Sequence, residues 1–180
     1  RDGNLLEEVA ENCRVLQINN PILTRMDLMK IQAMKREGFR VETVSLLYYK
    51  NTPLERAVER LFVACDKAYK QGANIVILSD RGVDENHVAL PSLLAVPAVH
   101  NHLVQTRKCT AMSLILESGE PCEVHHFATL LGYGASAVNP YLAHATIKEL
   151  VEEELLDKDY YAAVKDYDNA ILVIHNMGCG

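Results

Sequence analysis

The chain has 180 residues, of which 49% are hydrophobic and 23% charged, and its formal net charge at pH 7 is −6. This length suits one domain, over residues 1–180, and the negative charge argues against a nucleic-acid partner. No apolar run approaches the ~20 residues that span a bilayer, and the polar N-terminus is unlike a signal peptide, so we expect a soluble chain with no membrane partner.

The cysteines indicate a reducing compartment. Secreted disulfide frameworks and structural zinc sites have paired, closely spaced cysteines. Here five cysteines are spread singly along the chain: Cys13, Cys65, Cys109, Cys122 and Cys179. We therefore expect reduced thiols in the cytoplasm. The chain also lacks an initiator methionine and ends in the apolar stretch Ala170–Ile174, so both ends resemble cuts in a longer polypeptide.

The first part of the chain alternates between strand-like and helix-like segments. Residues 14–18 predict a short strand, and residues 41–48, rich in β-branched and aromatic side chains, predict a longer one. Between them, Thr24 predicts the N-cap of a helix with Asp27 in its first turn and a C-terminal stop at Gly38.

A second helix is the most strongly patterned in the sequence. Residues 52–55 (Thr-Pro-Leu-Glu) have the pattern of a capping box with proline at the first helical position, and the helix is expected to end at Gly72. Its apolar residues form one stripe: Leu54, Ala57, Val58, Leu61, Phe62, Cys65 and Tyr69.

The remaining segments repeat the same alternation. Continuous apolar runs predict strands buried on both faces. The expected elements are a strand at 74–78, a helix near 91–107, a strand at 111–116, a helix at 123–131 closed by Gly132, a strand at 137–139 and an acidic helix at 146–156. Mid-helix proline removes a hydrogen bond and clashes with the preceding turn, so Pro97 predicts a kink or a break between two shorter helices.

Five strand-then-helix units of about 30 residues predict an α/β fold with a mostly parallel sheet and flanking helices. A full (β/α)₈ barrel takes about 250 residues. The chain therefore forms either an open doubly wound sheet or an incomplete, rudimentary TIM-barrel-like set of βα units.

Polar residues follow three of the predicted strands, and parallel folds bind ligands at the carboxyl ends of their strands. These residues are Ser79, Asp80 and Arg81 after the third strand, Glu117 after the fourth and Asn139, followed by Pro140 and Tyr141, after the fifth. One interpretation is a small-molecule site with Arg81 as an anion clamp and Asp80 or Glu117 as its acidic counterpart. The other is that these charges pair with one another and fix loops or contact a neighbouring domain.

Two histidine pairs suggest a metal site that helix geometry disfavours. His125 and His126 follow Cys122, but adjacent residues on a helix diverge by ~100°, so both imidazoles cannot easily hold one ion. His100 and His102 do not share a helix face either. We expect no metal, and we expect one imidazole of the 125–126 pair to point to the strand-end face.

The stretch Gly132–Ala135 superficially resembles a phosphate-binding loop, but it lacks the G-x-G-x-x-G spacing and follows a helix. We expect its glycines to end that helix and turn into the last strand. The run Glu152–Glu154 predicts a solvated helix face.

Three long motifs resemble the large subunit of glutamate synthase. They are residues 73–84, residues 124–135 with Val-His-His-Phe-Ala and Leu-Gly-Tyr-Gly-Ala, and residues 137–143, and the opening Asn-Pro-Ile-Leu-Thr at 20–24 also fits. The resemblance covers roughly residues 12–145 and falls on the family's central domain. It implies a rudimentary version of the flavin barrel, without flavin.

The family is an oxidoreductase that acts on CH–NH₂ donors: glutamine, 2-oxoglutarate and reductant give two glutamates. The resemblance implies partners in the same parent chain, namely an N-terminal amidotransferase domain and an FMN-binding barrel that lies beside an iron–sulfur cluster. Ammonia travels between them through a tunnel. A reductase subunit or ferredoxin supplies electrons, and which donor is used, NADPH, NADH or ferredoxin, lies outside these residues.

None of the family's catalytic parts matches a position here, because the chain starts at Arg1 and not at the amidotransferase's cysteine, and no cluster-binding cysteine set is present. The resemblance therefore implies a non-catalytic scaffold and tunnel wall, inactive by itself, in which residues 146–180 form an acidic helical tail leading toward a missing flavin domain. The alternatives are a stand-alone small-anion binding module and a purely architectural interaction domain.

Overall fold

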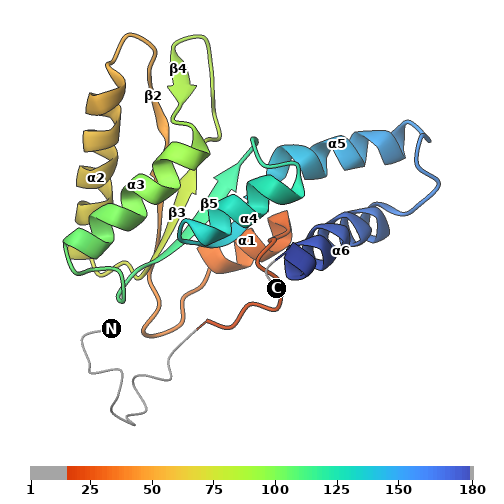
Figure 1. Cartoon of the computed structure of the whole chain (residues 1–180), viewed down its shortest axis with the longest axis horizontal. Helices are drawn as coiled ribbons and strands as arrows, with labels where there is room; N and C mark the ends of the chain where they lie inside the picture. The colour runs from red at the N-terminus through yellow and green to blue at the C-terminus, as the bar shows by residue number, and fades with distance from the viewer. Residues whose placement is uncertain (1–15, 179–180) are drawn as a thin grey trace.

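The computed structural model describes residues 16–178, and side chains as far as Leu172 (Figure 1). Its strands are β1 (Val41–Ser45), β2 (Leu47–Tyr49), β3 (Ile75–Ser79), β4 (His87–Ala89), β5 (Ser113–Ser118) and β6 (Ala135–Pro140). Its helices are α1 (Arg25–Gln32), α2 (Leu54–Lys70), α3 (Ser92–Gln105), α4 (Val124–Gly132), α5 (Tyr141–Glu152) and α6 (Tyr160–Gly178). The fold is α/β, as the sequence predicts.

The main sheet has four parallel strands in the order β1-β3-β5-β6 and is open in the described part of the chain. Residues 21–23 extend it beyond β6, where Leu23 N–H donates to Val138 O and Val138 N–H donates to Pro21 O, both at 2.8 Å. On the other side, β2 and β4 form a separate antiparallel pair that continues from β1. The open parallel sheet agrees with incomplete βα units.

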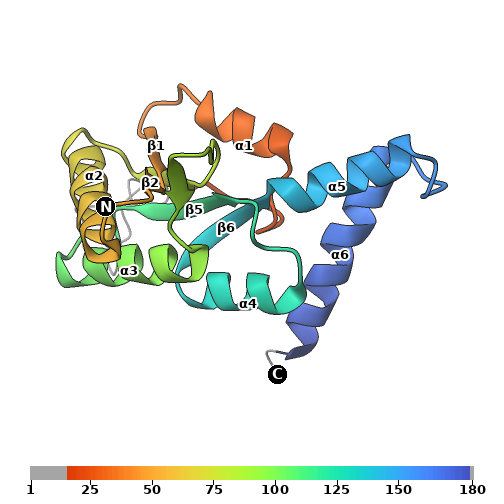
Figure 2. The same ribbon diagram turned by 90° about the horizontal axis from the view of Figure 1, so that it is seen from above.

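The two faces of the sheet are covered unequally (Figure 2). Alternate residues of a strand point to opposite faces. The larger core packs one face against α2, α3, α4 and α6, with Val76, Leu78, Leu116 and Val138 fully buried. On the opposite face, Ile77, Ile115 and Ala137 pack mainly against Leu28 and Ile31 of α1. Among residues 16–178, the second face is therefore covered by one short helix, α1, and by the segments that flank it.

Several predictions for the first part of the chain were wrong in detail. Within the described residues, the predicted strand at 14–18 is absent from 16–18, and residues 14 and 15 lie outside the description; residues 21–23 pair with the sheet instead. The Thr24–Asp27 capping box is present, but α1 ends at Gln32 and not at Gly38. The following polar residues 35–37 are exposed and offer no apolar face to continue it.

The predicted strand at 41–48 is divided at Leu46. Leu46 N–H donates to Ser79 O at 2.8 Å, while its carbonyl accepts from Leu90 N–H at 2.9 Å, so the chain leaves the main sheet here for the β2–β4 pair. The predicted capping box at 52–55 was also wrong, since Pro53 is the N-cap and no side chain caps α2. Thr52 lies one residue too early in the chain.

Pro97 does not break α3, which runs unbroken from Ser92 to Gln105. Proline at this position removes only the bond to the carbonyl of Leu93, one turn earlier, and Leu93 is 47% exposed, so water can reach that carbonyl. The short strand β4 has no sequence signal strong enough to predict it. The predicted helix at 146–156 begins at Tyr141 and ends at Glu152, and α6 follows it as a separate helix.

The termination of α4 follows the prediction. Gly132 is the last helical residue, Tyr133 is the C-cap and Gly134 adopts φ +112° as the chain turns into β6. Among the described residues, no helix combines the length and the apolarity needed to cross a bilayer.

A polar cluster joins α2 to the end of α3. The Asp66 carboxylate accepts from Lys108 Nζ at 2.5 Å and lies 3.1 Å from Nε2 of His102, whose ring stacks on Phe62. Burial by itself would raise the pKa of the Asp66 carboxyl, but the hydrogen bonds from Lys108 and His102 outweigh it and hold that pKa below its usual range.

This pKa gives a pH-dependent prediction. A carboxyl with a depressed folded pKa stabilises the fold above its unfolded pKa of about 3.9, and that stabilisation is lost as pH falls through the folded value. Asp66→Asn should lower the free energy of unfolding by about 1 kcal/mol at pH 7. In urea titrations the difference should shrink below about pH 4, whereas Glu59→Gln on the same helix should show little difference. A difference that grows toward low pH would contradict this assignment.

A buried contact between a histidine and an aspartate joins α5 to α6, which form a hairpin at one end of the molecule (Figure 1). His144 Nε2 lies 3.1 Å from Asp168 Oδ1, and the two side chains are only 5% and 7% exposed. Tyr167 packs edge-on against the His144 ring, and its hydroxyl donates to Cys122 O at 2.9 Å, before α4. The pair therefore fixes α6 to the rest of the molecule.

Asp168→Ala is expected to lower the free energy of unfolding by about 2–3 kcal/mol, because it leaves the buried His144 ring without its hydrogen-bond partner. Asp166, two residues earlier, pairs with Lys158 at 2.5 Å, but both side chains are more than half exposed. Asp166→Ala should therefore cost at most about 0.5 kcal/mol in the same urea titration. Equal losses for both variants would show that the buried pair does not hold the hairpin.

Candidate functional site

A row of polar side chains crosses the sheet at the carboxyl ends of its strands. Ser45 of β1 is in register with Ser79 of β3, Ser79 with Glu117 of β5, and Glu117 with Asn139 of β6. Because side chains alternate along a strand, these positions share the face of Ile77, Ile115 and Ala137, which α1 covers. On this face, the apolar side chains within the strands are thus followed by polar side chains at the carboxyl ends of the strands.

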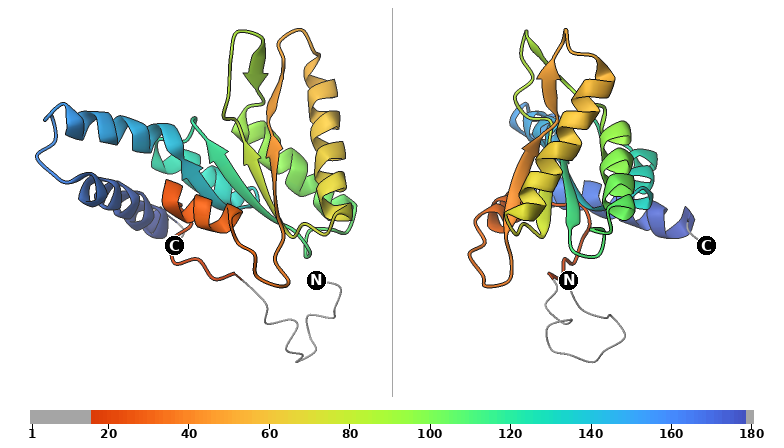
Figure 3. Two further views of the ribbon diagram at one scale, coloured as in Figure 1. Left: turned by 180° about the vertical axis from the view of Figure 1, so that it is seen from behind. Right: turned by 90° about the vertical axis from the view of Figure 1, so that its left-hand side faces the viewer.

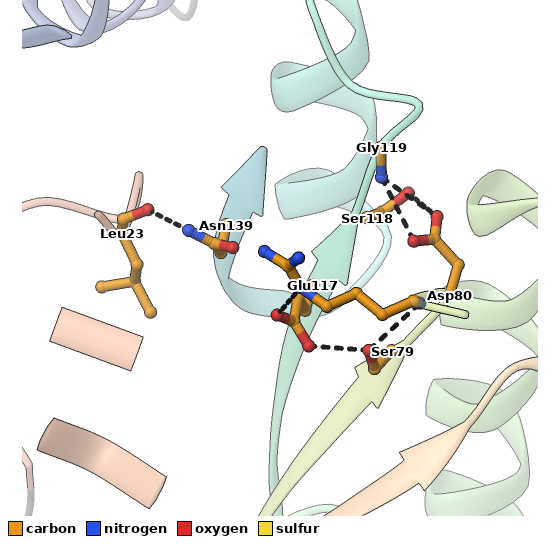
Figure 4. Close-up of polar contacts among 8 residues, drawn as sticks. Leu23, Ser79, Asp80, Glu117, Ser118, Gly119 and Asn139 are labelled. Carbon is orange, nitrogen blue, oxygen red and sulfur yellow. Dashed lines mark hydrogen bonds and ion pairs between the residues drawn. The ribbon is translucent and has the colours of Figure 1, made fainter. Parts of the chain in front are cut away.

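Glu117 is the centre of this row (Figure 4). Its carboxylate accepts from Ser79 Oγ at 2.6 Å and from Nε of Arg81, and the Glu117 side chain is 9% exposed. The Arg81 guanidinium also stacks over the Tyr141 ring, 4.0 Å from its centroid. The carboxylate is therefore neutralised by its own neighbours.

Asp80 makes a second set of contacts, with the loop after β5. Its carboxylate accepts from Ser118 Oγ at 2.5 Å and from Gly119 N–H at 3.1 Å, and Asp80 is 5% exposed. Burial, together with a hydrogen bond to Asp80, raises the pKa of the Tyr141 hydroxyl to about 12. Asp80 therefore accepts hydrogen bonds from the last residue of β5 and from the loop that follows it.

Asn139 is fully buried, and half of its amide is unpaired. Its Nδ2 donates to Leu23 O at 2.7 Å, which fixes the segment beyond β6 (Figure 4). Its Oδ1 has no hydrogen-bond partner among the described residues. A buried unpaired acceptor costs about 1–3 kcal/mol, so such an atom requires an explanation.

Five of the seven candidate residues come together: Ser79, Asp80, Arg81, Glu117 and Asn139. Within the described part of the chain, no hydrogen bond joins His125 or His126 to them. His126 Nδ1 instead accepts from the backbone N–H of Cys122 at 3.3 Å, while His125 is exposed. The role of Tyr141, which stacks under Arg81, had no signal beyond its place after the last strand.

The residues present do not fit either cofactor implied for the parent enzyme. Iron–sulfur clusters need several converging thiolates. Among the described residues, His, Cys, Asp and Glu form no group of three suited to a metal ion. The one fully buried described thiol is that of Cys65, whose pKa burial raises to about 12. The Gly134 turn packs directly against His100, so it is no open cradle for a flavin phosphate.

Fold and site together define a class of protein: an α/β domain with an open parallel sheet, whose carboxylates at the strand ends are hydrogen-bonded by neighbouring residues. The family model described as "Glutamate synthase central domain" matches residues 1–178. The chain belongs to this family.

Curated relatives agree with this family. The chain is 38% identical over 170 residues to the NADPH-type glutamate synthase large chain of Bacillus subtilis, covering 94% of this chain and 11% of that protein. It is 36% identical to the NADH-type glutamate synthase of Schizosaccharomyces pombe and 36% identical to a ferredoxin-dependent glutamate synthase of Synechocystis, covering 94% of this chain and 8% and 12% of those proteins. The chain thus spans about a tenth of the length of these relatives.

Proposed function

We propose that this chain works as the central, non-catalytic scaffold of a glutamate synthase, an oxidoreductase that converts glutamine, 2-oxoglutarate and reductant into two glutamates. The proposal rests on the family assignment and on relatives that are named as glutamate synthases. In it, the amidotransferase and FMN-binding domains lie elsewhere in the same parent chain, in the cytoplasm. FMN and the iron–sulfur cluster are held by those other parts, and a reductase subunit or ferredoxin delivers the electrons.

The observation that carries the scaffold role is the pairing of both strand-end carboxylates. A general base must be free to take a proton within about 2.6–3.2 Å of its substrate. Glu117 is occupied by Ser79 and Arg81, and Asp80 by Ser118 and Gly119. These bonds support the interpretation in which the charges fix loops and a contact surface.

Asn139 supports the finer proposal that the strand-end face forms part of an ammonia tunnel wall. Its unpaired Oδ1 is an acceptor that a passing ammonia molecule, a water molecule or a donor from an adjoining domain would satisfy. In the parent chain, Asn139→Leu should raise the amount of glutamine hydrolysed for each electron pair consumed, because some of the released ammonia would escape from the tunnel. Ser79→Ala, in the same row, is the control. If Asn139→Leu does not change the ratio of glutamine hydrolysed to electron pairs consumed, the tunnel wall is contradicted and a purely architectural role of the chain is supported.

A second candidate is a small-anion binding module. The Arg81 side chain is 42% exposed, and within the described residues only its Nε donates a side-chain hydrogen bond. If its remaining N–H groups bind an anion, 2-oxoglutarate or phosphate should raise the melting temperature of the wild-type protein and not that of Arg81→Ala. The scaffold proposal expects no shift with either anion.

A further inference from the structure

The free edge of the main sheet lies at β1. This strand pairs with β3 on one side and with no strand of the described chain on the other. It lies beside α2, and the left panel of Figure 3 shows it at the end of the sheet. Parallel sheets are normally buried, and an unpaired strand edge is a template for pairing with another chain.

The backbone groups at this edge follow from the ladder to β3. The carbonyl of Arg40 accepts from Ile75 N–H, and Leu46 N–H donates to Ser79 O. Bonding residues alternate in a strand, so the even positions between them bond inward. Val41, Thr43 and Ser45 consequently direct their N–H and C=O groups to the open edge, and Thr43 and Ser45 are exposed.

An open groove runs along this edge, between β1 and α2, with a volume of about 430 Å³. That is within the range of natural binding sites. Its floor on α2 is a stripe of small and apolar side chains, Ala57, Leu61, Ala64 and Ala68. Small residues leave room for apolar side chains of another segment to pack between helix and strand edge.

The groove also has a basic rim. Arg60 and Lys67 of α2 line it, both are exposed, and neither makes an ion pair within the described residues. The acidic residue lining it, Glu42, is paired with Arg40 at 3.3 Å. The unpaired charge at the groove is thus positive, in a chain whose net charge is −6.

We propose that an extended segment of the parent chain outside residues 1–180 adds a strand to the free edge of β1. Its backbone bonds Val41, Thr43 and Ser45, apolar side chains at alternate positions enter the groove, and an acidic side chain pairs with Arg60 or Lys67. The relatives are about ten times longer than this chain, so most of the parent lies outside it. This inference rests on the proposed place of the chain in a glutamate synthase.

The test uses the full-length parent enzyme with the photo-reactive residue p-benzoylphenylalanine at position 43, where the side chain of Thr43 is exposed. The proposal expects a cross-link to a parent segment beyond residues 1–180. Cross-links to residues 1–15 or to a second copy, or no cross-link, would each overturn it. In unmodified enzyme, hydrogen exchange at Val41, Thr43 and Ser45 should be at least about tenfold slower than for unstructured amides.

The charge on the rim gives a matched comparison. Arg60→Glu with Lys67→Glu should lower the cross-link yield by about fivefold or more through like-charge repulsion, whereas Lys70→Glu, outside the groove in the same last turn, should not. If the cross-link yields of the Arg60→Glu/Lys67→Glu variant and of Lys70→Glu are equal, the proposal that the added segment has an acidic side chain at this rim is wrong. Glutamine-dependent glutamate formation is measured on the same samples. If the enzyme is active but gives no cross-link, the added strand at β1 is refuted and the proposed function is not. If the wild-type parent is inactive, the proposed function is refuted.

Discussion

Asp80→Ala is expected to lower the free energy of unfolding by about 3 kcal/mol. The variant removes a buried carboxylate on which Ser118 Oγ and Gly119 N–H depend for hydrogen bonds, and Ser118 is itself fully buried. Buried donors left without an acceptor cost about 1–3 kcal/mol each, partly relieved when water enters. Urea unfolding should show a lower midpoint with an unchanged slope.

Two companion variants make this result specific. Asp80→Asn keeps one carbonyl acceptor of the same size and should lose roughly half as much. Glu85→Ala removes an exposed loop carboxylate five residues later and should change stability little. A loss below about 1 kcal/mol for Asp80→Ala would contradict a structural role for its hydrogen bonds.

Gly134→Ala is expected to destabilise the protein by about 3 kcal/mol, for two separate reasons. Gly134 has φ +112°, which L-residues rarely adopt, and an added Cβ would lie 2.4 Å from Cγ and Nδ1 of His100. Combining the change with His100→Ala removes the two closest contacts, leaves Cβ of residue 100 at 3.0 Å and does not relieve the backbone strain. The double variant should therefore lose less than the two single losses added together.

Gly132→Ala, two residues earlier, is the matched control. Gly132 is helical, and an added Cβ would meet nothing within 4 Å. Alanine is the better helix former, so this variant should gain about 0.5–1 kcal/mol. If thermal unfolding showed that Gly132→Ala and Gly134→Ala both lower stability, the cause would be the loss of glycine from this loop in general and not the close approach of residue 134 to His100.

The parts of the fold that could be predicted are those with a local signal. The apolar runs of β3 and β5 are buried at nearly every position and were found from hydrophobicity alone. β2 lies mostly within the strand predicted at 41–48, but its separation from β1 and its pairing with β4, about 40 positions away, have no local signal. The sequence predicts a helical tail over residues 146–180 but not its division into α5 and α6, which pack against each other through the contact of Asp168 with His144.

The candidate site could be placed from the sequence, but its hydrogen bonds could not be assigned. Ser79, Glu117 and Asn139 follow apolar strand residues, so their common position at the strand ends was predictable. Which groups they bond was not. The Glu117 carboxylate is bonded to Arg81 and that of Asp80 to Ser118, and only the register and the loop after β5 decide this.

In the proposed scaffold, the carboxylates of Asp80 and Glu117 stabilise the structure and take no part in the reaction. The most direct test is glutamine-dependent glutamate formation by the parent enzyme carrying Glu117→Gln, with folding checked by its melting temperature. The substituted amide has the same shape as the carboxylate but cannot exchange a proton as a carboxylate does. We expect turnover within about threefold of wild type, because the Glu117 carboxylate only holds its neighbours. A folded enzyme slowed by about a hundredfold or more would show that Glu117 is a general acid or base.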